Sequence, residues 1–398
     1  MIDITFIIPA YGEADLVERS VGSIAGQWLA KEGVHIILVN DCSPNVSDGY
    51  NSLKERYEHR VKSFTILQTE KNSGQGIARQ TGIDACQTEY FAFCDEDDMY
   101  APIAYYVFSD AIESNKYQRD QYGKWLKDSK GDYIIREDYI PAAVVAAAVE
   151  QTSPECMCQI PPENDLWVQS HLFNKKFLVE HDIRFLEPSS RHSEDYQWSS
   201  MVFPSIGFDD NWTGLLVDSS RQMFYWLDNP NSQSRKDPFY GEMLSGYTCR
   251  SSTIILNYYE NCEKHNLKQT DAIKKFFLGK LVNSTAYNYF ALYNFIYKVI
   301  KEGYVPALEQ DWTILRDSVS DLCKMMREYW DEYTYTARAE QIYACKNLSD
   351  CRTEGFEPMV DFDTFCQKGD IVLDWSFEDL INAKDEWYIT DKGIFKRK

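Results

Sequence analysis

The chain has 398 residues, enough for one large or two ordinary domains. Hydrophobic residues make up 44% and charged residues 26%, a balance typical of a globular protein with a sizeable core. The net charge of −21 disfavours a general nucleic-acid binder because an acidic surface repels polyanions, although it leaves room for a local basic groove.

Strands and helices alternate over the first hundred residues. Short apolar runs bounded by turn residues predict four strands, at residues 4–9, 34–39, 64–67 and 90–94. Apolar residues at helical spacing predict three helices between them, at residues 14–28, 49–61 and 76–86. This alternation with short connections predicts an α/β fold with a mostly parallel sheet and helices on both faces.

The pattern changes along the rest of the chain. Residues 110–140 predict a helix followed by an excursion, and residues 166–187 predict a strand followed by a helix. Residues 215–217 and 222–227 look like a pair of strands. We expect an α/β domain at residues 1–240 and a mainly helical C-terminal region at residues 241–398, with no internal repeat.

The cysteines and the first residues indicate the cytoplasm. The 11 cysteines are odd in number and show no paired spacing, as is usual in a reducing compartment. Residues 1–4 lack the basic start of a signal peptide, and the longest run of small apolar residues, 142–149, is too short to cross a bilayer. We therefore expect a cytoplasmic protein without a transmembrane segment.

The predicted strand at residues 90–94 ends abruptly in an acidic cluster. Its four carboxylates belong to Asp95, Glu96, Asp97 and Asp98. A strand that stops at such a cluster delivers charge to the carboxyl edge of a sheet, where open α/β sheets bind ligands. Adjacent oxygen ligands suit Mg²⁺ or Mn²⁺, ions that can carry a diphosphate leaving group, with Asp95 and Asp97 as candidate ligands. The alternative is a solvated acidic turn.

Three more stretches are predicted at the same edge of the sheet. Pro9, Tyr11 and Glu13 follow the first strand and Asp41 follows the second, so these residues should converge with the acidic cluster. Tyr11 can stack on a base, and Asp41 can accept hydrogen bonds from a ribose or a base edge.

The third stretch, residues 72–82, contains Gly74, Gly76 and Arg79. Its Gly-x-Gly lacks an acidic partner at dinucleotide-binding spacing, so that reading is weak. Glycines that open a helix would instead bring Arg79 towards the crevice. The alternative is a tight turn with Arg79 on the surface.

Residues 1–100 resemble a family-2 glycosyltransferase of GT-A fold. Four stretches in order carry the resemblance: Pro9-Ala10-Tyr11, Asp41-Cys42-Ser43, residues 72–82 and Asp95-Glu96-Asp97. The resemblance implies that Tyr11, Glu13 and Asp41 hold the nucleoside and that Gly74 and Arg79 lie near the sugar or diphosphate. It also implies that Asp95 and Asp97 hold the sugar and the metal.

The resemblance continues to about residue 240. Glu194-Asp195 matches the family's Glu-Asp pair, and the segment with Ser232 and Arg235 resembles the loop that closes over the diphosphate. The implied catalytic residue is Asp195, as the base that takes the proton of the acceptor hydroxyl, with Glu194 beside it. The alternative for Asp195, from its position alone, is a carboxylate favoured by a helix N-terminus.

We therefore expect a metal-dependent inverting glycosyltransferase that uses a nucleotide-sugar donor, with UDP as the family's commonest carrier. A glycan is the expected acceptor. One alternative is a phage-type enzyme that glycosylates hydroxymethylated pyrimidines in DNA, which the charge of −21 disfavours. Another is a non-catalytic nucleotide-binding scaffold.

Overall fold

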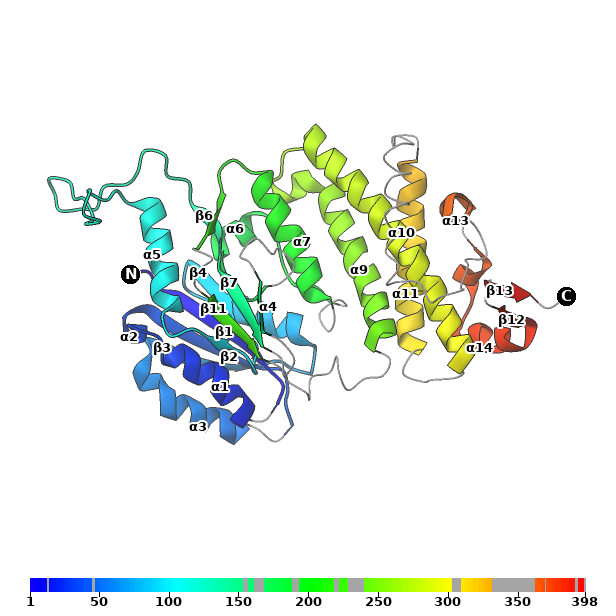
Figure 1. Ribbon diagram of the computed structural model, residues 1–398, viewed down its shortest axis with the longest axis horizontal. Coiled ribbons are helices and arrows are strands. Elements are labelled where there is room, and N and C mark those ends of the chain that lie inside the picture. Colours follow the sequence, from blue (N-terminus) through cyan, green and yellow to red (C-terminus); the bar gives the residue numbers. More distant parts are fainter. Residues whose placement is uncertain are drawn as a thin grey trace. The chain divides into compact units, whose positions relative to one another are not determined.

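The computed structural model of the chain describes residues 1–12, 14–44, 47–152, 157–160, 168–187, 193–217, 222–227, 240–302, 309–330, 362–368, 370–390 and 393–396. Two compact units form, one from Met1–Pro230 with His265–Lys268 and the other from Asn231–Lys264 with Gln269–Lys398. Figure 1 labels many elements of both. Among the described helices, none combines the length and the hydrophobicity that spanning a bilayer requires.

The first unit is built on a seven-stranded sheet with the order β10-β6-β9-β4-β1-β2-β3. The strands are β1 (Ile4–Ala10), β2 (Val34–Asn40), β3 (Ser63–Gln68), β4 (Tyr90–Phe93), β6 (Ala142–Ala146), β9 (His171–Asn174) and β10 (Thr213–Leu216). All neighbours pair in parallel except β9, which runs antiparallel to both β4 and β6. The predicted mostly parallel sheet is confirmed.

Helices cover both faces of this sheet. The helices of the unit are α1 (Ala14–Ala25), α2 (Ala30–Gly33), α3 (Ser47–Tyr57), α4 (Gln75–Ala85), α5 (Ala104–Lys116), α6 (Lys175–Glu180) and α7 (Glu194–Gly207). Val17 and Val21 of α1 pack into the core with Phe6 of β1. Ile7 points to the opposite face, because side chains alternate along a strand, and there it meets α4. A Cβ on Gly82 would lie 2.3 Å from Ile7, so glycine lets α4 pack closely on the sheet.

A smaller sheet has the order β5-β11-β7-β8. Its strands are β5 (Met99–Tyr100), β7 (Ala148–Thr152), β8 (Met157–Ile160) and β11 (Gln222–Leu227). The expected pairing of residues 215–217 with 222–227 was wrong, because β10 joins the large sheet beside β6 whereas β11 lies between β5 and β7. Residue periodicity identifies strands but not their partners.

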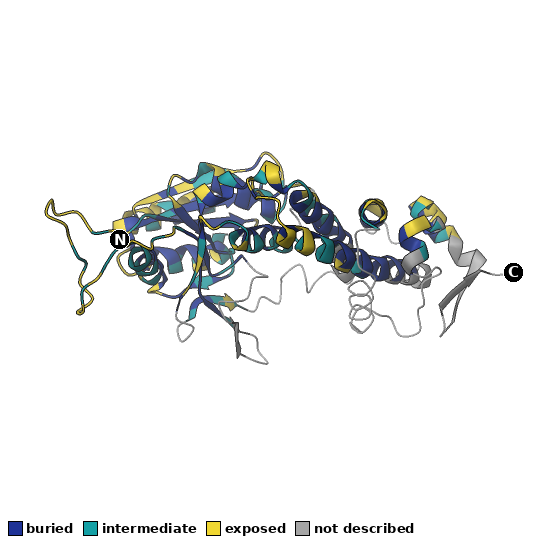
Figure 2. Cartoon of the chain, turned by 90° about the horizontal axis from the view of Figure 1, so that it is seen from above, coloured by how far each residue is buried: buried dark blue, intermediate teal, exposed yellow. Residues whose placement is uncertain are grey.

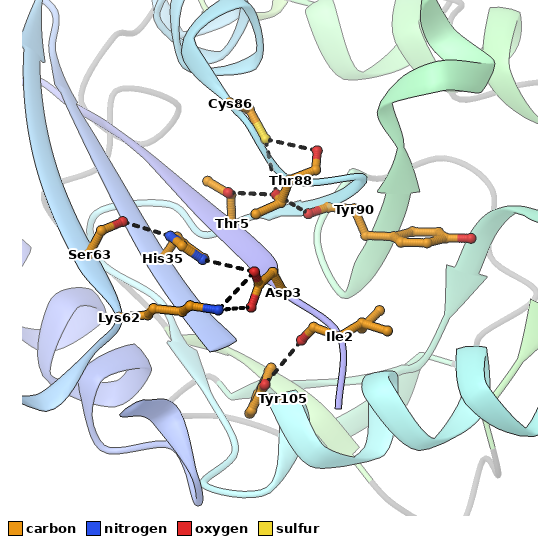
Figure 3. Close-up of polar contacts among 10 residues, drawn as sticks. All are labelled: Ile2, Asp3, Thr5, His35, Lys62, Ser63, Cys86, Thr88, Tyr90 and Tyr105. Atoms are coloured by element: carbon orange, nitrogen blue, oxygen red, sulfur yellow. Dashed lines mark hydrogen bonds and ion pairs between the residues drawn. The ribbon is translucent and has the colours of Figure 1, made fainter. Parts of the chain in front are cut away.

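The amino edge of the large sheet is closed by polar contacts (Figure 3). Lys62 donates to both oxygens of Asp3, at 2.7 and 2.9 Å. His35 Nδ1 lies 2.7 Å from Ser63 Oγ, and the Tyr105 hydroxyl donates to the carbonyl of Ile2. These contacts join the starts of β1, β2 and β3, so the polar side chains at this edge have a structural role. We therefore look for a ligand site at the opposite, carboxyl edge of the sheet.

Residues 116–136, here called the three-strand insertion, leave the end of α5 and return before β6. They contain an eight-residue repeat, in which Tyr117, Trp125 and Tyr133 occupy equivalent positions. Figure 2 shows this segment as mostly exposed chain outside the layers of its unit. The expectation of no internal repeat was wrong, because three short copies share few residue types.

The second unit is mainly helical, as predicted. Its described elements are α9 (Tyr240–Glu260), α10 (Asp271–Glu302), α11 (Glu309–Glu328), α13 (Phe362–Lys368), α14 (Phe377–Glu386) and a hairpin of β12 (Trp387–Thr390) and β13 (Gly393–Lys396). Trp312 of α11 is fully buried, stacks on Phe295 of α10, and donates its ring N–H to the carbonyl of Trp375. Residues 331–361, within the region expected to be helical, lie outside the described residues.

Candidate active site

Asp41 organises the loop between β3 and α4. It follows β2 directly and is buried. Its Oδ1 accepts hydrogen bonds from the Thr69 hydroxyl at 2.8 Å and the Ser73 N–H at 3.0 Å, and its Oδ2 accepts from the Gly74 N–H at 2.8 Å. Gly74 has φ +89°, in the region that favours glycine. The carboxylate therefore fixes the backbone just before α4.

The end of β1 lies beside the acidic cluster. Pro9 is part of β1, and Tyr11 follows it with half of its surface exposed. The Tyr11 N–H donates to Glu96 Oε2 at 2.9 Å. The contact joins the two turns that were expected to converge and leaves the Tyr11 ring at the surface. Glu13 lies outside the described residues.

The four carboxylates of the acidic cluster have different environments. Burial raises the pKa of Glu96 to about 7, against the hydrogen bond from Tyr11. Asp98 is almost fully buried and accepts the Leu227 N–H at 2.9 Å. Burial and then the charge of Asp95 raise the pKa of Asp98 to about 9. Asp97 is partly exposed. The cluster is therefore not a uniformly solvated turn.

Arg79 is the centre of the site. Its side chain is fully buried on α4, one turn before Gly82. It forms ion pairs with Asp95 Oδ1 at 2.8 Å, Glu194 Oε1 at 3.0 Å and Asp195 Oδ1 at 2.6 Å. Burial alone would lower the pKa of Arg79, but the three carboxylates outweigh it and raise that pKa above its ordinary value. Arg79 therefore joins the end of β4 to the start of α7.

Two glutamines complete this network, and sequence reasoning missed both. Gln75 donates to Asp95 Oδ1 and Gln169 donates to Asp95 Oδ2, each at 2.7 Å. Gln169 also hydrogen-bonds to Asp195, a contact that partly opposes the rise in the pKa of that carboxyl caused by burial. Gln75 stands inside the Gly-x-Gly stretch and was within reach of a motif search. Gln169 precedes β9, where no local pattern marks it.

Glu194 and Asp195 are adjacent on α7, and burial raises the pKa of both carboxyls. Burial and the neighbouring Asp195 raise the pKa of Glu194 to about 8. Burial also raises the pKa of Asp195, but Arg79 opposes that shift. With three carboxylates around one guanidinium, one proton shared within the group relieves repulsion. We assign the proton to Glu194 at neutral pH, which leaves Asp195 as the ionised member.

The donor atoms at this edge fit a hard divalent cation that takes few protein ligands. The part of the chain that the structure describes contains no group of three or more His, Cys, Asp and Glu side chains arranged for a metal ion. Mg²⁺ is commonly held by one or two carboxylates together with substrate phosphates and water. Asp95 and Asp97 have carboxylate oxygens of that kind, and each carboxylate oxygen has two lone pairs. Asp95 Oδ2 thus keeps an acceptor position beside its bond from Gln169.

The predicted site residues fall into two groups. The structure brings together Asp95, Arg79, Glu194 and Asp195 by direct contact, and it joins Tyr11 to the acidic cluster and Asp41 to Gly74. Ser232 and Arg235 lie outside the described residues. The roles assigned to all these residues towards a donor or an acceptor stay predictions.

Comparisons with known proteins give a consistent result. Residues 5–135 match the sequence profile of the family described as Glycosyl transferase family 2. The uncharacterized glycosyltransferase EpsJ of Bacillus subtilis is 29% identical over 239 residues, which are 58% of this chain and 62% of EpsJ. The poly(ribitol-phosphate) beta-glucosyltransferase of Bacillus spizizenii is 34% identical over 116 residues, 28% of this chain and 18% of that protein. The chain thus spans less than two thirds of these relatives.

Solved structures show the same fold. The crystal structure of S. aureus TarS, residues 1–349, superimposes with a TM-score of 0.55 at 14% identity, and covers 99% of this chain and 96% of its own. The same protein in complex with UDP-GlcNAc gives a TM-score of 0.54 at 15% identity, with 90% and 95% covered. At such identities the likeness concerns the fold.

Proposed function

This chain belongs to glycosyltransferase family 2, and from that premise we propose that it moves a sugar from a UDP-linked donor to a hydroxyl group of a glycan, with inversion at the anomeric carbon. The observation that carries the proposal is the set of ion pairs from Arg79 to Asp95, Glu194 and Asp195. Apolar side chains of similar size would stabilise the fold at least as well as these buried charges, and removing one partner of the network is costly. A chemical role therefore explains the presence of the charges better than a structural role does.

The proposed donor site uses the end of β1 and the loop held by Asp41. The Tyr11 ring would stack on the base. Asp41 would accept a hydrogen bond from the nucleoside and would also position the Gly74 backbone, whose N–H it binds. Support for a UDP donor comes from TarS, a structure of the same fold in complex with UDP-GlcNAc. Glu13, Ser232 and Arg235 are proposed as further donor contacts.

A divalent cation belongs to the proposal. Asp95 and Asp97 would hold Mn²⁺ or Mg²⁺, which when bound would neutralise charge on the departing nucleoside diphosphate. Asp95 has a second task in this scheme, because it also accepts hydrogen bonds from Gln75 and Gln169 and pairs with Arg79. These contacts fix the orientation of its carboxylate and so reduce the entropic cost of binding a cation.

Asp195 is the proposed base. It would accept the proton of the acceptor hydroxyl as that oxygen bonds to the anomeric carbon and the bond to the diphosphate breaks on the opposite side. Arg79 holds Asp195 in place and favours its ionised form, whereas Glu194 holds a proton at neutral pH. In this scheme Arg79 is a positioning residue that links the base to Asp95.

A glycan is favoured over DNA as the acceptor. Two relatives are named for glycosyl transfer to poly(ribitol-phosphate), one from Bacillus spizizenii and TarP from Staphylococcus aureus. A cytoplasmic location is also part of the proposal, since seven cysteines of the described residues are free thiols, which suits a reducing compartment. We also propose that residues 1–240 form the catalytic domain and that residues 241–398 form a separate helical region.

The test is a donor panel read as nucleoside diphosphate release. UDP-glucose, UDP-GlcNAc and GDP-mannose are offered with Mn²⁺, with Mg²⁺ and with a chelator. We expect release from a UDP-sugar that depends on the cation and is lost in Asp195→Asn. Equal release with the chelator would contradict the metal assignment, and release by no donor would contradict the enzyme assignment.

A further inference from the structure

The three-strand insertion, residues 116–136, closes on itself. The Gln118 N–H donates to the carbonyl of Ile134, the Leu126 N–H to that of Gln118, and the Ile134 N–H to that of Leu126, at 2.9 to 3.0 Å. These bonds run in a cycle, so each of the three short strands pairs with the other two. The segment is therefore a small folded unit and not an irregular loop.

Two identical turns join the strands. Asp120 Oδ1 accepts the N–H groups of Tyr122 and Lys124, and Asp128 Oδ1 accepts those of Lys130 and Asp132. Gly123 and Gly131 have φ +79° and +90°, a conformation that glycine adopts without strain. Both turn carboxylates are thus occupied by the backbone, whereas the lysines of the two turns are exposed.

Cations lie over the aromatic rings of the repeat. The Tyr117, Trp125 and Tyr133 ring centroids are 5.4 to 6.5 Å apart. Arg119 lies 3.8 Å from the Trp125 ring centroid, and Lys127 lies 4.8 Å from that of Tyr133. Such contacts hold a cation in place without neutralising its charge.

The charge of the insertion is opposite to that of the chain. Residues 116–136 carry six Lys or Arg side chains against three Asp, a net charge of +3, in a chain of −21. Ion pairs with Asp110 and Asp138 neutralise Arg119 and Arg136 at its base, which leaves four lysines against three Asp, so the lysines on the strands and turns are the cations that face outward. A polyanion repelled by the rest of the surface would be attracted here.

The insertion also lies far from the acidic cluster. The helix α5 returns from that cluster to the insertion, because β6 runs in the same direction as β4. It has 13 residues and is therefore about 20 Å long. A ligand held by both places must be a chain of several units.

Resting on the proposed function, we propose that the three-strand insertion holds an anionic glycan polymer, one whose repeat unit carries a phosphate or a carboxylate, while a distant unit of the same polymer occupies the acceptor site. Binding at two places raises the effective concentration of the acceptor end. A membrane surface fits less well. Of the two turn tips only the first presents an aromatic side chain, Tyr122, and the tips are otherwise polar, so little apolar surface is available for insertion into a bilayer.

The test compares two double variants of the full chain. Lys124→Glu with Lys130→Glu changes the insertion and keeps the backbone bonds of its turns. Lys264→Glu with Lys268→Glu makes the same charge change at other exposed lysines. Binding of long-chain inorganic polyphosphate, alginate and neutral dextran is measured by calorimetry at low and moderate salt.

We expect the wild type and the control to bind both polyanions but not dextran. In the insertion variant the slope of log affinity against log salt should fall by about 1.4, as expected for two lost contacts to a single-stranded polyanion. Lys124→Gln with Lys130→Gln should lose less polyanion affinity than the Glu double variant, because it removes two positive charges without adding negative ones. Near-ultraviolet circular dichroism of each variant shows whether Trp125 keeps its environment.

Transfer then separates long from short acceptors. The KM for a long anionic acceptor should rise roughly tenfold or more in the insertion variant, whereas an acceptor shorter than about 20 Å should keep its KM, because it cannot reach both places. Equal polyanion binding by the two double variants would overturn the inference, and so would binding to phosphatidylglycerol vesicles that the insertion variant alone loses. Polyanion binding without any sugar transfer would contradict the proposed function and not the inference.

Discussion

Replacing Asp195 with Asn should lower the rate of sugar transfer by about 100-fold or more, which corresponds to about 2.7 kcal/mol of activation free energy. An amide cannot take the proton of the acceptor hydroxyl at the moment that the oxygen attacks. Donor binding does not use this carboxylate in our scheme, so calorimetry should give a near-native affinity for UDP.

The structure also predicts the effect on stability. Asp195 Oδ1 accepts one hydrogen bond from Arg79, and Asn keeps an oxygen that can accept it, but the Asn NH2 group cannot accept the bond from Gln169. Arg79 retains its ion pair with Asp95 and its hydrogen bond to Glu194. Because burial and the charge of Asp95 raise the pKa of Asp195 and so disfavour its charge, removing that charge relieves its repulsion with Asp95. The lost hydrogen bond and the relieved repulsion oppose each other, so the free energy of unfolding should stay within about 1 kcal/mol of the wild type.

The matched control is Glu194→Gln. Burial and Asp195 raise the pKa of Glu194 to about 8, so at pH 7 its carboxyl is mostly protonated and an amide of the same shape imitates it. We expect a loss of less than about tenfold, or below 1.4 kcal/mol. The two variants alter neighbouring carboxylates around one guanidinium, so a general disturbance of the site would affect both.

The assay follows UDP release and sugar transfer under saturating donor, with chemical denaturation of each variant in parallel. The reasoning fails if Asp195→Asn keeps most of its activity or if Glu194→Gln is the inactive variant. It fails equally if Asp195→Asn loses several kcal/mol of stability, since the carboxylate would then be chiefly structural.

Three further changes test other parts of the site. Asp97→Asn should abolish metal-dependent turnover while the fold persists, and unchanged activity across a Mn²⁺ titration would remove Asp97 as a ligand. Asp41→Asn leaves one acceptor too few for the N–H groups of Ser73 and Gly74, so chemical denaturation should show a loss of ~1–3 kcal/mol, the cost of an unsatisfied buried donor, and calorimetry should show a weaker affinity for UDP because the loop before α4 is no longer fixed. Asp98 has a folded-state pKa of about 9 against an unfolded value near 3.8, so its contribution to stability is present below pH 4 and is lost as pH rises towards 9. With a chelator present, the free energy of unfolding of the wild type should fall by roughly 2 to 4 kcal/mol between pH 5 and 8, whereas that of Asp98→Asn should not show this fall. Parallel pH profiles of unfolding for the two proteins would contradict the raised pKa of Asp98.

Local patterns were enough for the elements and for one edge of the sheet. The strand at residues 90–94 was recognisable because its apolar run ends at Asp95, and the glycines before Arg79 marked the start of a helix. Since the carboxyl ends of parallel strands meet at one edge, these positions also predicted that Tyr11 and the acidic cluster would converge, and the hydrogen bond from Tyr11 to Glu96 confirms that they do.

Which residues share a contact was decided by the tertiary structure. Nothing in the sequence around Arg79 shows that it is fully buried or that its partners include Glu194 and Asp195, more than a hundred residues away. Gln169 was overlooked for the same reason, because its function lies in a bond to Asp95 across two strands.

The sequence by itself determined the family resemblance, the alternation of strands and helices, and the residue types at the strand ends, because these depend on hydrophobic period and turn chemistry over a few positions. The tertiary structure alone decided that burial and Asp195 raise the pKa of Glu194, that β10 and β11 belong to different sheets, and that residues 116–136 close into a cycle. Burial, charge partners and strand pairing are set by segments distant in the chain, and no local pattern encodes them.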